Sequence, residues 1–108
     1  MIPSDTRLAL IDQATDKADE SPDEFSPETL AAFVRYLRLR DLEADQWNRC
    51  GDFAVSAGLT HHQARRAVGQ LVRAGLLDRD VVQRRVRGQD GRYTVYRLSP
   101  AAMEGAGQ

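Results

Sequence analysis

The chain has 108 residues, of which 42% are hydrophobic, and a formal net charge of −1. These numbers fit one domain with its own core, and the absence of a long apolar run excludes a membrane-spanning helix. We expect no signal peptide. Cys50 is the single cysteine, which excludes an intrachain disulfide. It predicts a reducing, cytoplasmic setting in which the thiol is a small buried side chain.

The charge is divided unevenly along the chain. Residues 1–59 hold 12 Asp and Glu against 6 Lys and Arg, whereas residues 60–108 hold 4 against 9. A polyanion responds to where charge lies rather than to its sum, so the second part is the one that suits a nucleic acid. Of the 15 basic residues 14 are arginine, which favours forked contacts to phosphate and guanine, although a GC-rich genome would produce the same bias.

The N-terminal segment has only a weak helical pattern, at residues 5–18. Leu8, Ile11 and Ala18 share one side, with Ala14 nearby. So few large apolar side chains would not hold an isolated helix, and two interpretations stay open: a frayed arm, or a helix that packs against a partner subunit. The acidic, proline-interrupted segment 19–24 predicts a linker. Residues 1–24 are therefore interpreted as an arm and linker.

The first firm helix begins at Ser26 and Pro27, which suit the N-cap and the first helical position. A core-facing stripe follows at helical spacing: Leu30, Phe33, Val34 and Leu37. Tyr36 lies off this stripe. Trp47 is expected in the core, because one tryptophan between core segments is usually buried.

Two more helices are predicted on either side of Gly58. Asp52 is the expected cap of a short helix that Gly58 ends. Thr60 caps the next helix, which Gly75 ends, so that this helix occupies about residues 60–74. Its packed side carries Ala64, Ala67, Val68, Leu71 and Val72. The opposite side carries His62, Arg66, Gly69 and Arg73, with Arg65 on its flank.

A β-hairpin is predicted next. Residues 81–87 and 92–98 are β-type runs around a turn at 88–91, which contains an Asp-Gly pair and two glycines. Four arginines gather about this turn, and Asp90 is the only acid near them in sequence: Arg84, Arg85, Arg87 and Arg92. Residues 100–108 are expected to be a flexible tail, with at most a helical turn at 101–103.

The stretch FAVSAGLTHHQARRAVGQLVRAGLL resembles the helix-turn-helix of winged-helix transcription regulators, and the hairpin after it resembles their wing. The resemblance extends over about residues 33–98. It implies a mainly α fold with three core helices and a C-terminal β-hairpin, placed here in residues 25–99, with an optional helix before it. It also implies sequence-specific binding of double-stranded DNA by a prokaryotic regulator that acts as a homodimer. Any small-molecule effector is left open.

Groove geometry then assigns the DNA-binding residues. A helix fits the major groove and reads base edges with its N-terminal and outward residues. Here these are His61, His62, Gln63, Arg65 and Arg66. Gln63 suits adenine and arginine suits guanine. Phosphate contacts are expected from Thr60 and Arg73. The wing would reach the backbone or the neighbouring minor groove through Arg84, Arg85, Arg87 and Arg92.

The simplest alternative for the arginine side is a solvated helix face. Three observations argue against it, and the first is that the hairpin adds more arginine. No acidic residue lies between His61 and Leu77, and Gly69 costs the helix roughly 1 kcal/mol relative to alanine. A partner that approaches the backbone closely would account for that glycine. An alternative of a different class is a winged-helix docking module in a replication, partition or polymerase-associated complex, whose arginines would contact an acidic protein.

No catalytic, cofactor or metal site is expected. His61 and His62 point about 100° apart on a helix, and no His or Cys lies three or four positions from them. The chain has no phosphate-binding glycine loop, no nucleophile elbow and no paired carboxylates on an apolar face. The sequence therefore predicts a binding protein and not an enzyme.

Overall fold

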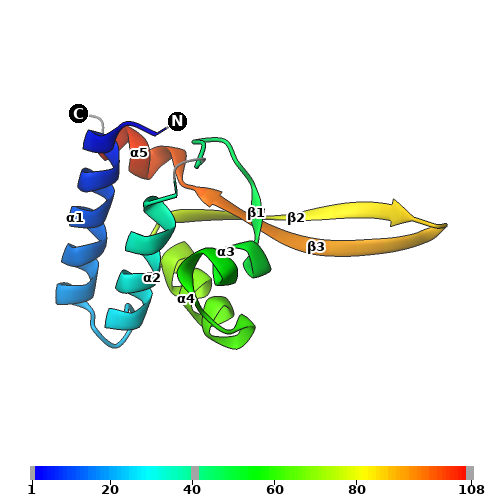
Figure 1. Ribbon diagram of the computed structural model, residues 1–108, viewed down its shortest axis with the longest axis horizontal. Helices are drawn as coiled ribbons and strands as arrows, with labels where there is room; N and C mark the ends of the chain where they lie inside the picture. The colour runs from blue at the N-terminus through cyan, green and yellow to red at the C-terminus, as the bar shows by residue number, and fades with distance from the viewer. Residues whose placement is uncertain (1, 40–41, 107–108) are drawn as a thin grey trace.

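Three helices pack together at the centre of the computed structural model, which describes residues 2–39 and 42–106 and gives only the backbone at residues 84, 86 and 106 (Figure 1). They are α2 (Pro27–Leu37), α3 (Cys50–Ala57) and α4 (His61–Arg73). All three contribute fully buried side chains to one hydrophobic core, among them Phe33, Leu37, Ala57 and Leu71. The central three-helix arrangement is therefore the one that the sequence predicts.

Helix α2 begins as its sequence predicts, but it turns one more aromatic residue inward. The Ser26 hydroxyl accepts a hydrogen bond from the Thr29 N–H at 3.2 Å, and Pro27 occupies the first turn. Tyr36 was expected off the core stripe, yet it is buried against Phe53, with the ring centroids 5.1 Å apart. Its hydroxyl accepts a hydrogen bond from the Asn48 side chain, which is why a tyrosine is tolerated there.

Helices α3 and α4 are joined by the short connection 58–60. Gly58 ends α3 with a φ of 69°, in the left-handed region. Helix α3 begins earlier than predicted, so Asp52 lies in its first turn rather than at its cap. The Asp52 carboxylate accepts a hydrogen bond from the Arg49 N–H at 3.0 Å. Thr60 caps α4 as expected.

Helix α4 is tied to the start of α2 by a buried polar residue. Gln70 is 4% exposed, and its Oε1 accepts hydrogen bonds from the Ser26 N–H at 3.0 Å and from the Thr29 hydroxyl. A buried acceptor that lost these donors would destabilise the fold by roughly 1–3 kcal/mol. These bonds can form only when α2 and α4 have one orientation relative to each other. They therefore fix the direction in which the exposed side of α4 faces.

The sheet consists of a long hairpin and one short edge strand. Strands β2 (Leu77–Val86) and β3 (Gln89–Leu98) are antiparallel, and β1 (Asn48–Arg49) pairs with β3 in the order β1-β3-β2. The hairpin projects from the helices and lengthens the molecule to 46 × 29 × 21 Å (Figure 1). Strand β1 supports it only at its root, opposite Val95 and Tyr96.

The turn of the hairpin differs from the prediction. Val86 lies opposite Gln89, so Arg87 and Gly88 are the two loop residues, with φ values of 53° and 79°. Two residues with positive φ form a turn whose twist matches that of the strands. This register pairs the buried Leu77 with the buried Leu98, whereas a turn at 88–91 would have placed the exposed Val81 there. Burial of the Leu77–Leu98 pair, where the ribbon leaves the helices, therefore sets the strand register and with it the position of the turn.

The two ends of the chain contradict the prediction of an arm and a flexible tail. Helix α1 (Ser4–Glu20) packs on α2 and on α5 (Pro100–Ala106), and Leu10 is fully buried, whereas Leu8 is 61% exposed. The Gln13 side chain donates a hydrogen bond of 3.2 Å to the Ala102 carbonyl. Two helices with few large apolar side chains thus pack against each other within the same chain. Residues 107 and 108 lie outside the described part.

Trp47 also departs from its expected place. It is 38% exposed, and the Arg97 guanidinium stacks on its ring, 4.6 Å from the centroid. Cys50 is half-buried against the core, consistent with its interpretation as a small hydrophobic side chain. None of the described helices is long and apolar enough to cross a membrane.

Candidate nucleic-acid interface

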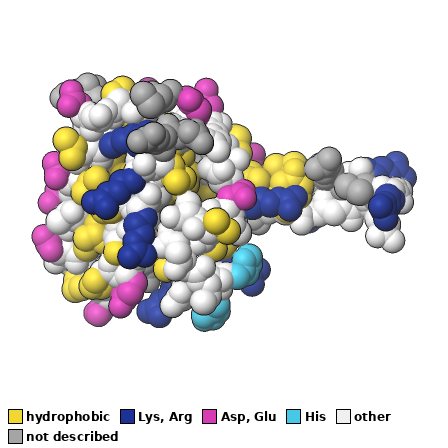
Figure 2. All heavy atoms as spheres, viewed as in Figure 1, with side chains coloured by type: hydrophobic (Ala, Val, Ile, Leu, Met, Phe, Trp, Pro, Cys, Tyr) yellow, Lys and Arg dark blue, Asp and Glu magenta, His cyan; other side chains and the backbone are white. Residues whose placement is uncertain are grey.

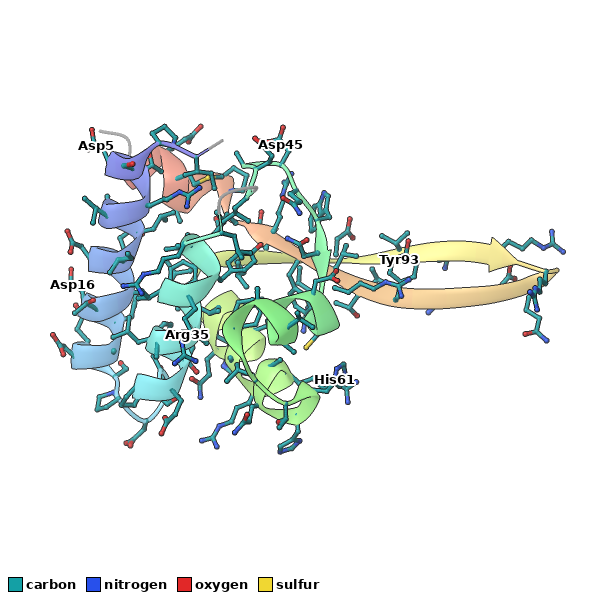
Figure 3. The ribbon with its side chains drawn as sticks, viewed as in Figure 1. Asp5, Asp16, Arg35, Asp45, His61 and Tyr93 are labelled. Atoms are coloured by element: carbon teal, nitrogen blue, oxygen red, sulfur yellow. The ribbon has the colours of Figure 1, made fainter. Side chains whose placement is uncertain are left out.

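The side chains predicted to read bases lie on the exposed side of α4. All five are exposed to solvent: His61, His62, Gln63, Arg65 and Arg66. Figure 3 shows His61 pointing away from the helical core, beneath the root of the hairpin. Within the described part of the chain, no carboxylate pairs with Arg65, Arg66 or Arg73. This side of α4 is therefore a cationic surface whose charges are free to meet a ligand.

Thr60 and Gln63 hold each other in place at the start of α4. The Thr60 hydroxyl accepts a hydrogen bond from the Gln63 N–H at 3.2 Å, and Gln63 Oε1 accepts one from the Thr60 N–H at 3.0 Å. A bidentate contact of Gln63 with adenine uses both its oxygen and its nitrogen, so Gln63 Oε1 would have to accept a second hydrogen bond beside the capping bond. The Nε2 group of Gln63 and the hydroxyl proton of Thr60 remain available as donors.

The fold itself does not require a glycine at position 69. A Cβ atom built on Gly69 would meet only Arg73 Nη1, at 3.7 Å, which is an ordinary van der Waals distance. The residue lies on α4 between the exposed Arg66 and Arg73. Packing therefore leaves the glycine unexplained, whereas close approach of a partner to the helix backbone would explain it.

Strand alternation sorts the ribbon into two sides. Leu77 and Leu98 are opposite each other and bury against the helices. The same side therefore includes, further along the ribbon, the cross-strand pairs Arg79–Tyr96, Val81–Thr94, Gln83–Arg92 and Arg85–Asp90. Arg79, Arg85 and Arg92 are all exposed. The arginines of this side thus continue the cationic surface of α4 along the ribbon.

The other side of the ribbon is already occupied by interactions within the chain. The Arg49 guanidinium lies over the Tyr93 ring, 4.0 Å from its centroid, and Arg97 stacks on Trp47 and pairs with Asp78 at 3.7 Å. Asp80 also lies on this side, opposite Val95. The two arginines whose side chains the structure describes here, Arg49 and Arg97, are held by aromatic rings and, for Arg97, by a carboxylate, so they are poorly placed to bind a phosphate backbone.

The predicted wing arginines lie at different positions on the ribbon. Arg85 and Arg92 lie on the helix-facing side of the ribbon, and Arg87 is exposed at the turn itself. Arg84 pairs with Gly91 in the ladder, and its side chain lies outside the described part. Sequence reasoning missed Arg79, because the predicted strand began at residue 81. Its alternation with Val81 and Gln83 was the signal that could have found it.

Acidic side chains gather at the opposite end of the molecule. Helix α1 exposes Asp5, Asp12, Asp16, Asp19 and Glu20, and Figure 2 shows acidic groups along that edge, whereas the two histidines and several cationic groups lie toward α4 and the ribbon. A polyanion would therefore be oriented with α4 and the ribbon toward it.

The described residues contain no group of three or more His, Cys, Asp or Glu side chains that could hold a metal ion. Burial raises the pKa of Tyr36, Cys50 and Tyr96, which keeps all three groups protonated near neutral pH. Comparison of the chain with protein-family models, curated proteins and solved structures gave no match. The functional assignment therefore rests on the geometry and charge of this surface.

Proposed function

We propose that the protein binds double-stranded DNA sequence-specifically, as a transcription regulator of the winged-helix type. Helix α4 would enter the major groove, and the β2–β3 ribbon would contact the backbone or the neighbouring minor groove. The observation that carries this proposal is the continuity of two unpaired arginine surfaces, one on α4 and one on the helix-facing side of the ribbon.

The balance of charges supports a polyanionic partner. Six arginines lie exposed on these two surfaces without a carboxylate partner in the described structure: Arg65, Arg66, Arg73, Arg79, Arg85 and Arg92. A solvated surface usually mixes both signs of charge, but α4 has no acidic residue. A phosphate backbone would neutralise these groups and release its condensed counterions.

The shape of the surface supports a duplex in particular. A single α-helix fits the major groove of B-DNA, and a two-stranded ribbon can lie along a neighbouring groove or backbone. His61, His62 and Arg66 lie on the exposed side of α4 near its N-terminus, where a recognition helix meets base edges. The Thr60 hydroxyl and Arg73 would bind phosphates at its two ends.

We further propose that two copies bind one pseudo-palindromic site. A single module of this size buries too little surface for tight and selective binding. Helix α1 uses Leu10 and Ala14 within its own chain, so the contact between the copies would be formed by other residues.

The test is selection of bound sequences from a random duplex pool, followed by affinity measurements on the selected site. Arg66→Ala should lose roughly 1–3 kcal/mol on that site and much less on a random duplex. Arg38→Ala, an exposed arginine at the end of α2, is the charge-matched control and should bind like the natural chain. Failure to enrich any sequence would contradict specific recognition. Equal losses of Arg66→Ala on both duplexes would reduce Arg66 to a phosphate contact.

A further inference from the structure

A polar corner lies where the ribbon leaves the helices. Arg79 of β2 is directly opposite Tyr96 of β3. In a hairpin with a two-residue turn the flanking residues form a hydrogen-bonded pair, and such pairs alternate with non-hydrogen-bonded ones. Counting from Val86–Gln89 makes Arg79–Tyr96 a non-hydrogen-bonded pair. Side chains of these pairs are the closest across strands, with Cα atoms about 4.5 Å apart.

Helix α4 packs against β2, so the corner lies at the junction of the helical core and the ribbon. Tyr96 packs against the core with its ring half-buried, and its hydroxyl has no hydrogen-bond partner in the described structure. Burial and then nearby Cys50 raise the pKa of Tyr96, while Arg79 and Arg65 act in the opposite direction. Arg79, directly opposite Tyr96 in the ladder, is therefore the guanidinium group that the strand pairing places beside this hydroxyl.

We propose that Arg79 and Tyr96 together bind a single phosphodiester of DNA, the one that lies between the groove occupied by α4 and the groove or backbone reached by the ribbon. This inference rests on the proposed function. The DNA strand that runs between two adjacent grooves has to pass the point where α4 and the ribbon meet. That point is this corner. The forked guanidinium group of Arg79 and the phenolic O–H of Tyr96 can both donate hydrogen bonds, and these suit the two acceptor oxygens of a phosphodiester.

A phosphate bound there would set the register between helix and ribbon. Such a contact has no base preference of its own, but it fixes where α4 lies along the duplex. It also explains why Arg79 is on the helix-facing side, whereas its neighbours Asp78 and Asp80 are on the other. An acidic side chain at position 79 would repel the backbone at the closest point.

The experiment uses the full chain and the duplex selected for it, with one charged phosphodiester at a time replaced by a neutral methylphosphonate. The natural chain should lose roughly tenfold in affinity at one linkage between the two contacted grooves. Arg79→Gln should bind the unmodified duplex roughly tenfold more weakly and lose much less than the natural chain at that same linkage, where the Tyr96 hydroxyl still donates. Other sensitive linkages should weaken the variant as much as they weaken the natural chain.

Two controls keep the outcome clear. Tyr96→Phe preserves the half-buried ring and removes only the hydroxyl. It should show the same pattern of linkage sensitivity as Arg79→Gln, with a smaller effect. This control stays informative if Arg79→Gln disturbs the fold. Arg38→Gln should leave the whole linkage profile unchanged. If the natural chain binds but Arg79→Gln and Tyr96→Phe lose as much affinity as the natural chain at every linkage, the corner site is wrong while the proposed function stands. If the natural chain binds no duplex, both are wrong.

Discussion

The Asn48 side chain of β1 donates a hydrogen bond of 2.8 Å to the Tyr36 hydroxyl of α2. This contact joins the edge of the sheet to the helical core through a ring that is itself buried against Phe53. Burial raises the pKa of Tyr36, the hydrogen bond from Asn48 opposes that effect, and the charge of Asp52 adds to it. The folded protein therefore holds the Tyr36 proton more tightly than the unfolded chain does.

This difference predicts a loss of stability in alkali. Above the ordinary tyrosine pKa of about 10, the unfolded chain releases the proton while the folded chain retains it. The free energy of unfolding should fall as the pH rises from there toward the raised pKa of Tyr36. Urea unfolding at about pH 8 and pH 11 should show a smaller fall for Tyr36→Phe than for the natural chain. Equal falls would mean that Tyr36 does not contribute.

Two leucines of helix α1 should contribute very differently to the stability of the fold. Leu10 is fully buried against the core, whereas Leu8 is 61% exposed. Leu10→Ala should cost roughly 2–5 kcal/mol, because it removes buried methyl groups and leaves a cavity. Leu8→Ala, the matched control, should stay within about 0.5 kcal/mol. Chemical denaturation measures both. A small effect of Leu10→Ala would show that α1 is only loosely attached.

Gly69 predicts opposite effects on stability and on binding. Gly69→Ala should stabilise α4 by roughly 1 kcal/mol, because the added methyl meets only the end of the flexible Arg73 side chain. The same methyl should weaken binding to the selected duplex if the DNA backbone comes close to this point of the helix. Thermal unfolding and binding titration are compared on one preparation. A more stable variant with unchanged affinity would exclude close approach at Gly69.

The turn of the ribbon allows a charge to be removed without harm to the hairpin. Arg87 has a φ of 53° and precedes Gly88, and Asn-Gly is the preferred pair for such a turn. Arg87→Asn should therefore keep or raise the melting temperature while it lowers DNA affinity at all sequences alike. The salt dependence should fall by about one phosphate contact. A variant that binds as the natural chain does would place the tip of the ribbon away from DNA.

Much of the fold was predictable because local chemistry decides it. The cap at Thr60, the stop at Gly58 and the apolar side of α4 are each specified within a few residues. Predictions failed where a distant partner decides. Leu10 is fully buried in a helix that packs on α2 and on α5, and α5 lies at the other end of the described chain. The turn at Arg87 is selected by the pairing of Leu77 with Leu98 at the other end of the ribbon.

The candidate site was predictable in its composition but not in its arrangement. The exposed arginines of α4 follow directly from helical periodicity. The side on which each ribbon arginine lies depends on the register, so Arg79 was overlooked and Arg84 could not be distinguished from Arg85. The capping role of Gln63 was also missed, although a Thr-x-x-Gln pattern at a helix start is a known signal for it.

The most direct test of DNA binding by α4 and the ribbon is to measure the affinity of the full chain for duplex DNA over a range of salt concentrations. Binding through six or more arginine–phosphate contacts should weaken about 10³-fold or more between about 50 mM and 200 mM salt, and the logarithm of the affinity should fall linearly with that of the salt concentration. No binding at the lowest salt concentration, or an affinity that salt leaves unchanged, would contradict DNA as the ligand of α4 and the ribbon. An acidic protein would then be the partner to seek.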